Sequence, residues 1–138
     1  MPCPFFEPRA LATAPEHRSA RLPLFDEYDG DCRSASEAFP VPPPQRFRYC
    51  NHGYSRHSCE HFPAAETRSS FRYAVIRHSF AALEIICIEE QDYAPLRWHP
   101  AQYSPATGQF EPELADLCMR AQALAFCRSY LERFPSAP

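Results

Sequence analysis

Four cysteines in the first half of the chain are the residues best suited to chemistry. Cys3, Cys32, Cys50 and Cys59 are separated by 28, 17 and 8 residues. Four thiolates brought together by loops are the ligand set of a tetrahedral zinc ion or a [4Fe–4S] cluster. Structural zinc sites usually take cysteines in pairs about two to four residues apart, and these four contain no such pair. The spacing therefore favours a [4Fe–4S] cluster as the cofactor, with zinc as the alternative.

Three histidines lie among the last two of these cysteines and complicate the ligand set. His52, His57 and His61 follow Cys50 or flank Cys59. One imidazole in place of a thiolate would give a Cys₃His site. We favour the other interpretation, in which the histidines are exposed or hydrogen-bond to sulfur or backbone around the ligands. A further alternative is that the four cysteines are ordinary buried thiols, since free cysteine is often buried.

The remaining cysteines are expected to be structural. Cys87 lies between isoleucines in an apolar run, while Cys118 and Cys127 are nine residues apart in a helical pattern. At 3.6 residues per turn, that spacing puts Cys118 and Cys127 on opposite sides of a helix, so they cannot share one site. Seven cysteines also cannot all pair within one chain. With no signal-peptide pattern and no long apolar run, we expect a cytoplasmic protein that does not enter a membrane.

Composition excludes several enzyme classes. The 138 residues include no lysine, which rules out a Schiff-base lysine and a P-loop lysine. The three glycines are too dispersed for a nucleotide-binding loop. No nucleophile–base arrangement stands out, so we assign no catalytic residue and do not expect an enzyme.

The cysteine motifs carry a resemblance. "CPFF" at 3–6, "GDC" at 30–32 and "CNHGYSRHSCEHFP" at 50–63 resemble the motifs of a group of small bacterial four-cysteine proteins. That group shares Cys-Pro-aromatic-Phe at its start and CNxGYxRxxCxxFP in its middle. The resemblance covers mainly residues 3–63. It implies the same four-cysteine set and brings no substrate with it.

Arginine and aromatic residues alternate near the third and fourth cysteines. Arg46, Arg48, Tyr54 and Arg56 form a pattern that can hold phosphates and stack bases. However, the net charge is −3 and an acidic segment lies at 26–31. Nucleic-acid binding is therefore the weaker hypothesis, and the sequence is also compatible with a redox or protein partner.

Patterning predicts which elements must position these residues. Residues 1–65 are rich in proline and poor in hydrophobic periodicity, which predicts an irregular Cys/Pro-rich metal-binding lobe. Residues 70–104 contain three apolar, partly alternating runs, typical of an antiparallel three-stranded sheet. Residues 112–134 carry one apolar helical stripe. We expect a single α+β domain over 1–138, with the lobe in 1–65 and the sheet plus one packed C-terminal helix in 66–138.

The sequence thus predicts a small soluble metalloprotein with one Cys₄-bound centre. Its role would be structural, redox-sensing or electron-carrying. A zinc-stabilised module that binds protein or nucleic acid is the second hypothesis, and a metal-free interaction domain is the third.

Overall fold

The computed structural model describes residues 1–15 and 21–135. Its C-terminal part is built on a four-stranded antiparallel sheet in the order β4-β5-β6-β7. The strands are β4 (Ser70–His78), β5 (Leu83–Gln91), β6 (Ala94–Ser104) and β7 (Gln109–Glu111). Alternate residues of β4 and β5 are buried on one face, among them Phe71, Leu83 and Cys87. That alternation is the period-2 pattern of strands with one face against a core.

Helix α2 (Leu117–Arg133) covers this buried face. Its first turn is capped by Asp116, whose side chain accepts a hydrogen bond of 2.9 Å from the Met119 N–H. The sequence predicted a helix start at Pro112. The capped helix starts five residues later, at Leu117. Met119, Ala123 and Phe126 are buried, and they belong to the same core cluster as the sheet residues.

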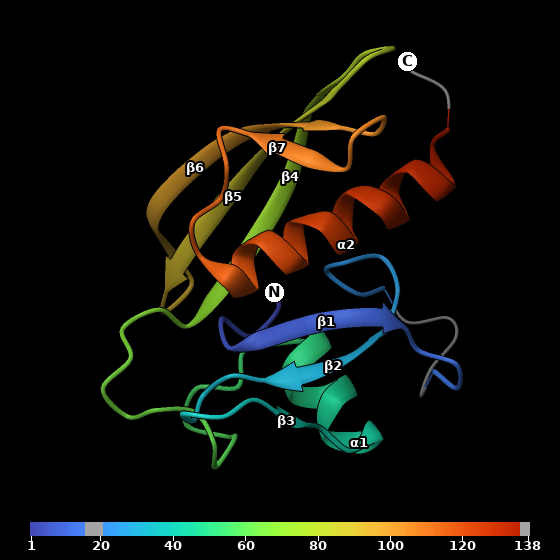
Figure 1. The fold of residues 1–138 in the computed structure, drawn as a ribbon. Helices are drawn as coiled ribbons and strands as arrows, with labels where there is room; N and C mark the ends of the chain where they lie inside the picture. The colour runs from blue at the N-terminus through green and yellow to red at the C-terminus, as the bar shows by residue number, and fades with distance from the viewer. Residues whose placement is uncertain (16–20, 136–138) are drawn as a thin grey trace.

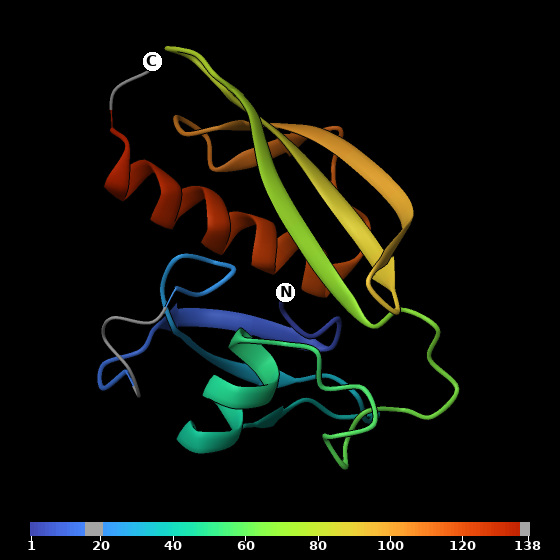
Figure 2. The same ribbon diagram turned by 180° about the vertical axis from the view of Figure 1, so that it is seen from behind.

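A second antiparallel sheet, in the order β1-β2-β3, lies on the other side of α2 (Figures 1 and 2). It comprises β1 (Phe6–Leu11), β2 (Tyr28–Cys32) and β3 (Phe39–Pro40). A short helix α1 (Pro43–Gln45) continues into the π-helix η1 (Arg46–Asn51). The helix therefore sits between two sheets, and residues on more than one of its faces are buried.

The fold class predicted from sequence is wrong in two respects. The structure has two antiparallel sheets of three and four strands, whereas one three-stranded sheet was expected. The N-terminal half is also not the irregular metal-binding lobe that was expected. Strands β1–β3 and η1 give it hydrogen-bonded structure of its own, and among the described residues no three His, Cys, Asp or Glu side chains are gathered to hold a metal ion. Its strands are short, contain prolines and include a register shift between Pro8 and Ala10, so they lack the alternation by which strands are recognised.

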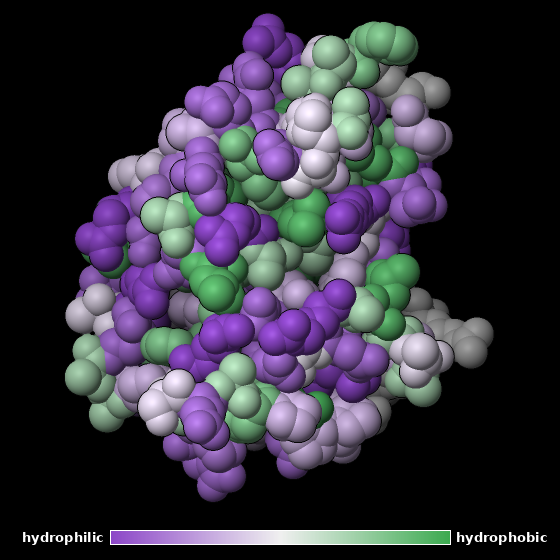
Figure 3. All heavy atoms as spheres, in the orientation of Figure 1, coloured by the Kyte–Doolittle hydropathy of each residue, from purple (hydrophilic) through white to green (hydrophobic). Residues whose placement is uncertain are grey.

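The three strands expected within 70–104 are present as β4, β5 and β6. The fourth strand, β7, is three residues long and pairs with the end of β6. Among the described residues, no helix has the length and apolar character needed to span a bilayer. On the face shown in Figure 3, apolar residues are interspersed among polar ones.

Candidate metal centre

The four N-terminal cysteines come from four different local structures. Cys3 lies in the turn before β1, and Cys32 is the last residue of β2. Cys50 belongs to η1, and Cys59 lies in the turn that follows it. The backbone joins two of these segments directly, because the Cys3 N–H donates to the Cys50 carbonyl at 3.2 Å.

Side-chain hydrogen bonds fix the segment that carries Cys50. Asn51 is 1% exposed, and its Oδ1 accepts a hydrogen bond of 2.8 Å from the Tyr28 N–H on β2. Its Nδ2 donates to the carbonyls of Tyr28 and Arg46 at 3.0 and 3.1 Å. A buried amide with these partners anchors η1 to β2. Such π-helical turns are rare and frequently occur at functional sites.

All four thiols line one small cavity. Aromatic side chains and two serines complete its wall: Phe5, Phe6, Tyr49, Phe62, Ser34 and Ser55, with His61. Cys3, Cys32 and Cys50 are 8–9% exposed, whereas Cys59 is half-buried. The rings of Phe5 and Phe62 meet edge to face at 5.5 Å. The structure thus brings four thiols, distant in sequence, into one largely apolar site.

The thiols at this cavity influence one another electrostatically. Burial raises the pKa of Cys3 to about 11, against the opposing effects of hydrogen bonds from the Phe5 N–H and Ser55, while Cys32 and Cys59 raise it further. Burial also raises the pKa of Cys50, and the other three thiols of the site add to this rise. The raised pKa values keep Cys3 and Cys50 protonated at neutral pH, because burial disfavours the charged thiolate.

The cavity does not have the dimensions of a ready single-ion site. Zn–S bonds of about 2.3 Å place tetrahedral sulfurs roughly 3.8 Å apart. Within the part of the chain that the structure describes, no three His, Cys, Asp or Glu side chains are gathered closely enough to hold a metal ion. The cavity volume is about 20 Å³, close to that occupied by one water molecule. An eight-atom cluster would fit only with the thiol side chains rotated outward.

The histidines do not share one position. His61 lines the cavity, and its ring lies 5.0 Å from that of Phe39. His52 and His57 are exposed and do not line the cavity. Of the three histidines that the sequence indicated as alternative ligands, His61 is therefore the best placed.

The arginine–aromatic pattern does not form one surface. Arg46 is buried, donates to Glu27 Oε2 at 2.6 Å and also pairs with Asp29. Arg56 reaches the Thr67 carbonyl at 3.2 Å, and Tyr54 stacks on Tyr93. Arg48 is exposed. The buried ion pair removes Arg46 from any phosphate-binding patch.

The other three cysteines lie in the core. Cys87 and Cys127 are 0% exposed and Cys118 is 6% exposed. Burial raises the pKa of Cys87 and of Cys118 to about 12. None of the three lines the four-thiol cavity, which agrees with their expected structural role.

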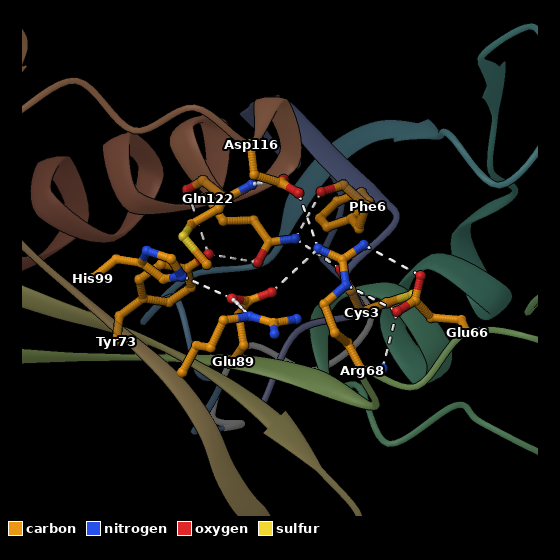
Figure 4. Close-up of polar contacts among 11 residues, drawn as sticks. Cys3, Phe6, Glu66, Arg68, Tyr73, Glu89, His99, Asp116 and Gln122 are labelled. Atoms are coloured by element: carbon orange, nitrogen blue, oxygen red, sulfur yellow. Dashed lines mark hydrogen bonds and ion pairs between the residues drawn. The ribbon is translucent and has the colours of Figure 1, made fainter.

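Gln122 makes polar contacts to the segment that carries Cys3, and the sequence analysis did not identify this residue. Its side chain is 0% exposed, and Nε2 donates to the carbonyls of Cys3 and Phe6, both at 2.7 Å. The Tyr73 hydroxyl donates to Gln122 Oε1 at 2.9 Å. Figure 4 shows this chain of contacts joining β4, α2 and the Cys3 turn. The signal available in the sequence was a glutamine among alanines in the apolar part of the helix.

A charged cluster lies beside that chain of contacts, also in Figure 4. Glu89 is 6% exposed; its Oε2 accepts from Arg97 Nε at 2.9 Å and lies 2.7 Å from His99 Nε2. Arg68 donates to Glu66 and Asp116, at 2.9 and 3.0 Å. Burial opposes ionisation of Glu89, but His99 and Arg97 hold its pKa below the usual value. These pairs join the start of α2 to the sheet, and each charged group of the cluster has an oppositely charged partner within it.

Comparison with protein-family models, with curated proteins and with solved structures finds no match to this chain.

Proposed function

We propose that this protein is a small metalloprotein in which Cys3, Cys32, Cys50 and Cys59 bind one metal centre, a [4Fe–4S] cluster. The observation that carries the proposal is the convergence of these four thiols on one cavity. Their segments are separated by up to 28 residues and come from a turn, a strand, a π-helix and a second turn. Its role is structural, redox-sensing or electron-carrying.

Two features support a cluster. First, four thiols from four separate segments line one cavity. Four thiolates are the number of ligands that a [4Fe–4S] cluster takes. Second, the wall is largely aromatic. Such a wall shields the site from water, and solvent exposure is one of the features that set a cluster's reduction potential.

Zinc is the second candidate, and the small cavity volume of about 20 Å³ favours it. A single ion needs less space than an eight-atom core. Four thiolates are also the ligand number of a tetrahedral zinc site. The protein would then be a zinc-stabilised binding module for a protein or, less favoured, a nucleic acid.

Anaerobic purification followed by visible absorbance and elemental analysis separates the two candidates. Brown protein that is bleached by a reductant and contains iron and sulfide supports the cluster. Colourless protein with stoichiometric zinc supports the second candidate. Protein that retains neither metal, and takes up neither on anaerobic reconstitution, contradicts both.

Single Cys→Ser variants test the ligand assignment. We expect serine at position 3, 32, 50 or 59 to reduce bound metal sharply, because each substitution removes a thiolate ligand. Serine at 87, 118 or 127 is the matched control, since these thiols are buried away from the cavity. Full metal retention in Cys3→Ser, or metal loss in Cys118→Ser, would show that the ligands are assigned wrongly.

The thiols also support a proposal about compartment. All seven cysteines are described, and all seven are unpaired. Unpaired thiols are typical of a reducing environment, so we place the protein in the cytoplasm. We further propose that it belongs with the small bacterial four-cysteine proteins that it resembles in residues 3–63, a proposal supported by its CPFF and CNHGYSRHSC motifs.

A further inference from the structure

A second cavity lies where β6 faces the chain between β7 and the start of α2. Its volume is about 830 Å³, a size typical of small-molecule binding sites. It shares no lining residue with the four-thiol cavity. Buried Ala101, Leu114 and Met119 form an apolar part of its wall. We call it the His99 cavity, after the imidazole that lines it.

His99 is oriented by a buried carboxylate. Its Nε2 lies 2.7 Å from Oε2 of Glu89, which is 6% exposed (Figure 4). Because a carboxylate only accepts hydrogen bonds, Nε2 carries the proton of neutral His99, and Nδ1 is the unprotonated nitrogen. Among the described residues, no group hydrogen-bonds to Nδ1. The imidazole is therefore available to accept a hydrogen bond from a ligand in the cavity.

The carboxylates that line the His99 cavity outnumber the arginines that pair with them. Four of them have an arginine partner, in the pairs Glu84–Arg77, Glu89–Arg97, Glu113–Arg120 and Asp116–Arg68, with N···O distances of 3.0, 2.9, 3.7 and 3.0 Å. The fifth, Glu111, is exposed and has no ion pair within the described part of the chain. The cavity therefore carries an uncompensated negative charge when His99 is neutral.

These features fit a cation with an apolar body. An ammonium group carries the required positive charge and has N–H donors for Nδ1 of His99. An anionic ligand would be repelled by Glu111 and would find no proton on Nδ1. Trp98 also lines the cavity and is 57% exposed, and an indole ring attracts cations.

We infer that the His99 cavity binds a small primary ammonium ligand with an apolar body. The ammonium group donates a hydrogen bond to Nδ1 of His99, and its charge balances that of Glu111. Glu89 is a positioning residue, because it holds the imidazole through Nε2. This inference goes beyond the proposed metal centre and does not depend on it.

Intrinsic fluorescence reports directly on this cavity, because Trp98 is the only tryptophan in the chain. The test is a titration of the full chain with 2-phenylethylamine at about pH 8, where an ordinary imidazole is neutral. The probe 3-phenylpropanoate has a similar body and the opposite charge. We expect saturable binding of the amine, and binding of the carboxylate at least about tenfold weaker.

Calorimetric titration with the same two probes detects binding that leaves the fluorescence of Trp98 unchanged. Equal affinities for the two probes overturn the inference. So does the absence of saturable amine binding by both methods. Neither outcome concerns metal content, so the proposed function is tested separately.

Two variants of the cavity test the assigned contacts. Glu111→Gln removes the uncompensated charge and should weaken amine binding about fivefold. Glu37→Gln is the matched control, because Glu37 is exposed and does not line the cavity, and it should leave the affinity unchanged. His99→Phe keeps a ring but removes the acceptor, and should weaken amine binding about tenfold.

Circular dichroism checks that each variant is folded. Because Glu111 is exposed, Glu111→Gln carries the test if His99→Phe does not fold. An unchanged amine affinity in either folded cavity variant overturns the inference, as does an equal loss in Glu37→Gln and Glu111→Gln.

Discussion

Replacing Gln122 by methionine should destabilise the protein strongly, although the two side chains are similar in length and volume. Gln122 is fully buried, and it joins the Cys3 turn to α2 and to Tyr73. Methionine fills the space but cannot donate to the carbonyls of Cys3 and Phe6. It also offers the Tyr73 hydroxyl only a weak acceptor.

The magnitude follows from the partners. Three hydrogen bonds, of 2.7, 2.7 and 2.9 Å, are lost, each worth about 1 kcal/mol net. The Cys3 carbonyl keeps the Phe6 N–H at 3.0 Å, and the Tyr73 hydroxyl keeps its 3.4 Å contact to Met119 O. The Phe6 carbonyl, by contrast, loses its partner on α2, at an additional ~1–2 kcal/mol. The free energy of unfolding should therefore fall by about 3–5 kcal/mol.

Urea unfolding of the wild type, Gln122→Met, Tyr73→Phe and the double variant measures these contributions. Tyr73→Phe removes one of the three bonds and should cost about 1–2 kcal/mol. Because that bond is shared, the double variant should lose less than the sum of the single variants, by about 1 kcal/mol. A loss below about 1 kcal/mol in Gln122→Met, or strict additivity in the double variant, would refute the reasoning.

Three further predictions concern residues outside the cavity. Arg46→Met should lower the free energy of unfolding by about 3–5 kcal/mol, because it removes the ion pair with Glu27 and leaves that carboxylate buried. Arg48→Met is the control. Because Arg48 is exposed, this variant should cost at most about 0.5 kcal/mol in the same urea titration. Arg133 donates hydrogen bonds of 2.8 and 3.0 Å to Asp26 and lowers the pKa of that carboxyl below its unfolded value of 3.8. The pair therefore stabilises the folded state fully above pH 3.8, and this stability is lost as the pH falls through the folded-state pKa. Asp26→Asn should accordingly reduce Tm at neutral pH and converge with the wild type in acid, and a constant Tm difference across this range would contradict the assignment. Gly53→Ala should reduce Tm much more than Gly108→Ala. Both glycines have a positive φ, of 87° and 72°, but a Cβ at position 53 would overlap the Met1 carbonyl oxygen, whereas the space around position 108 is open. Equal losses would show that the Met1 contact does not constrain Gly53.

The second half of the chain was the more predictable half. The runs that form β4, β5 and β6 are long and apolar enough to be recognised as strands from the sequence alone. By contrast, β1 and β2 have six and five residues, which include a proline, a glycine and several charged residues. Their pairing involves residues up to 26 apart, as between Phe6 and Cys32. Such strands are stabilised by their partners, so a local pattern does not identify them.

The sequence by itself determined the candidate ligands, because cysteine type, number and spacing limit which metal sites can form. Strand and helix periodicity also led us to expect a separate, structural role for Cys87, Cys118 and Cys127. Only the tertiary structure decided that α2 is buried between two sheets, which is why Cys118 and Cys127 are both buried although they lie far apart around the helix. It also decided that Arg46 is internal. His61 lines the four-thiol cavity, whereas His52 and His57 do not. Gln122 reaches the carbonyl of Cys3. These outcomes depend on contacts such as the one between Gln122 and Cys3, 119 residues apart, and a local sequence pattern does not encode which distant surface a side chain will meet.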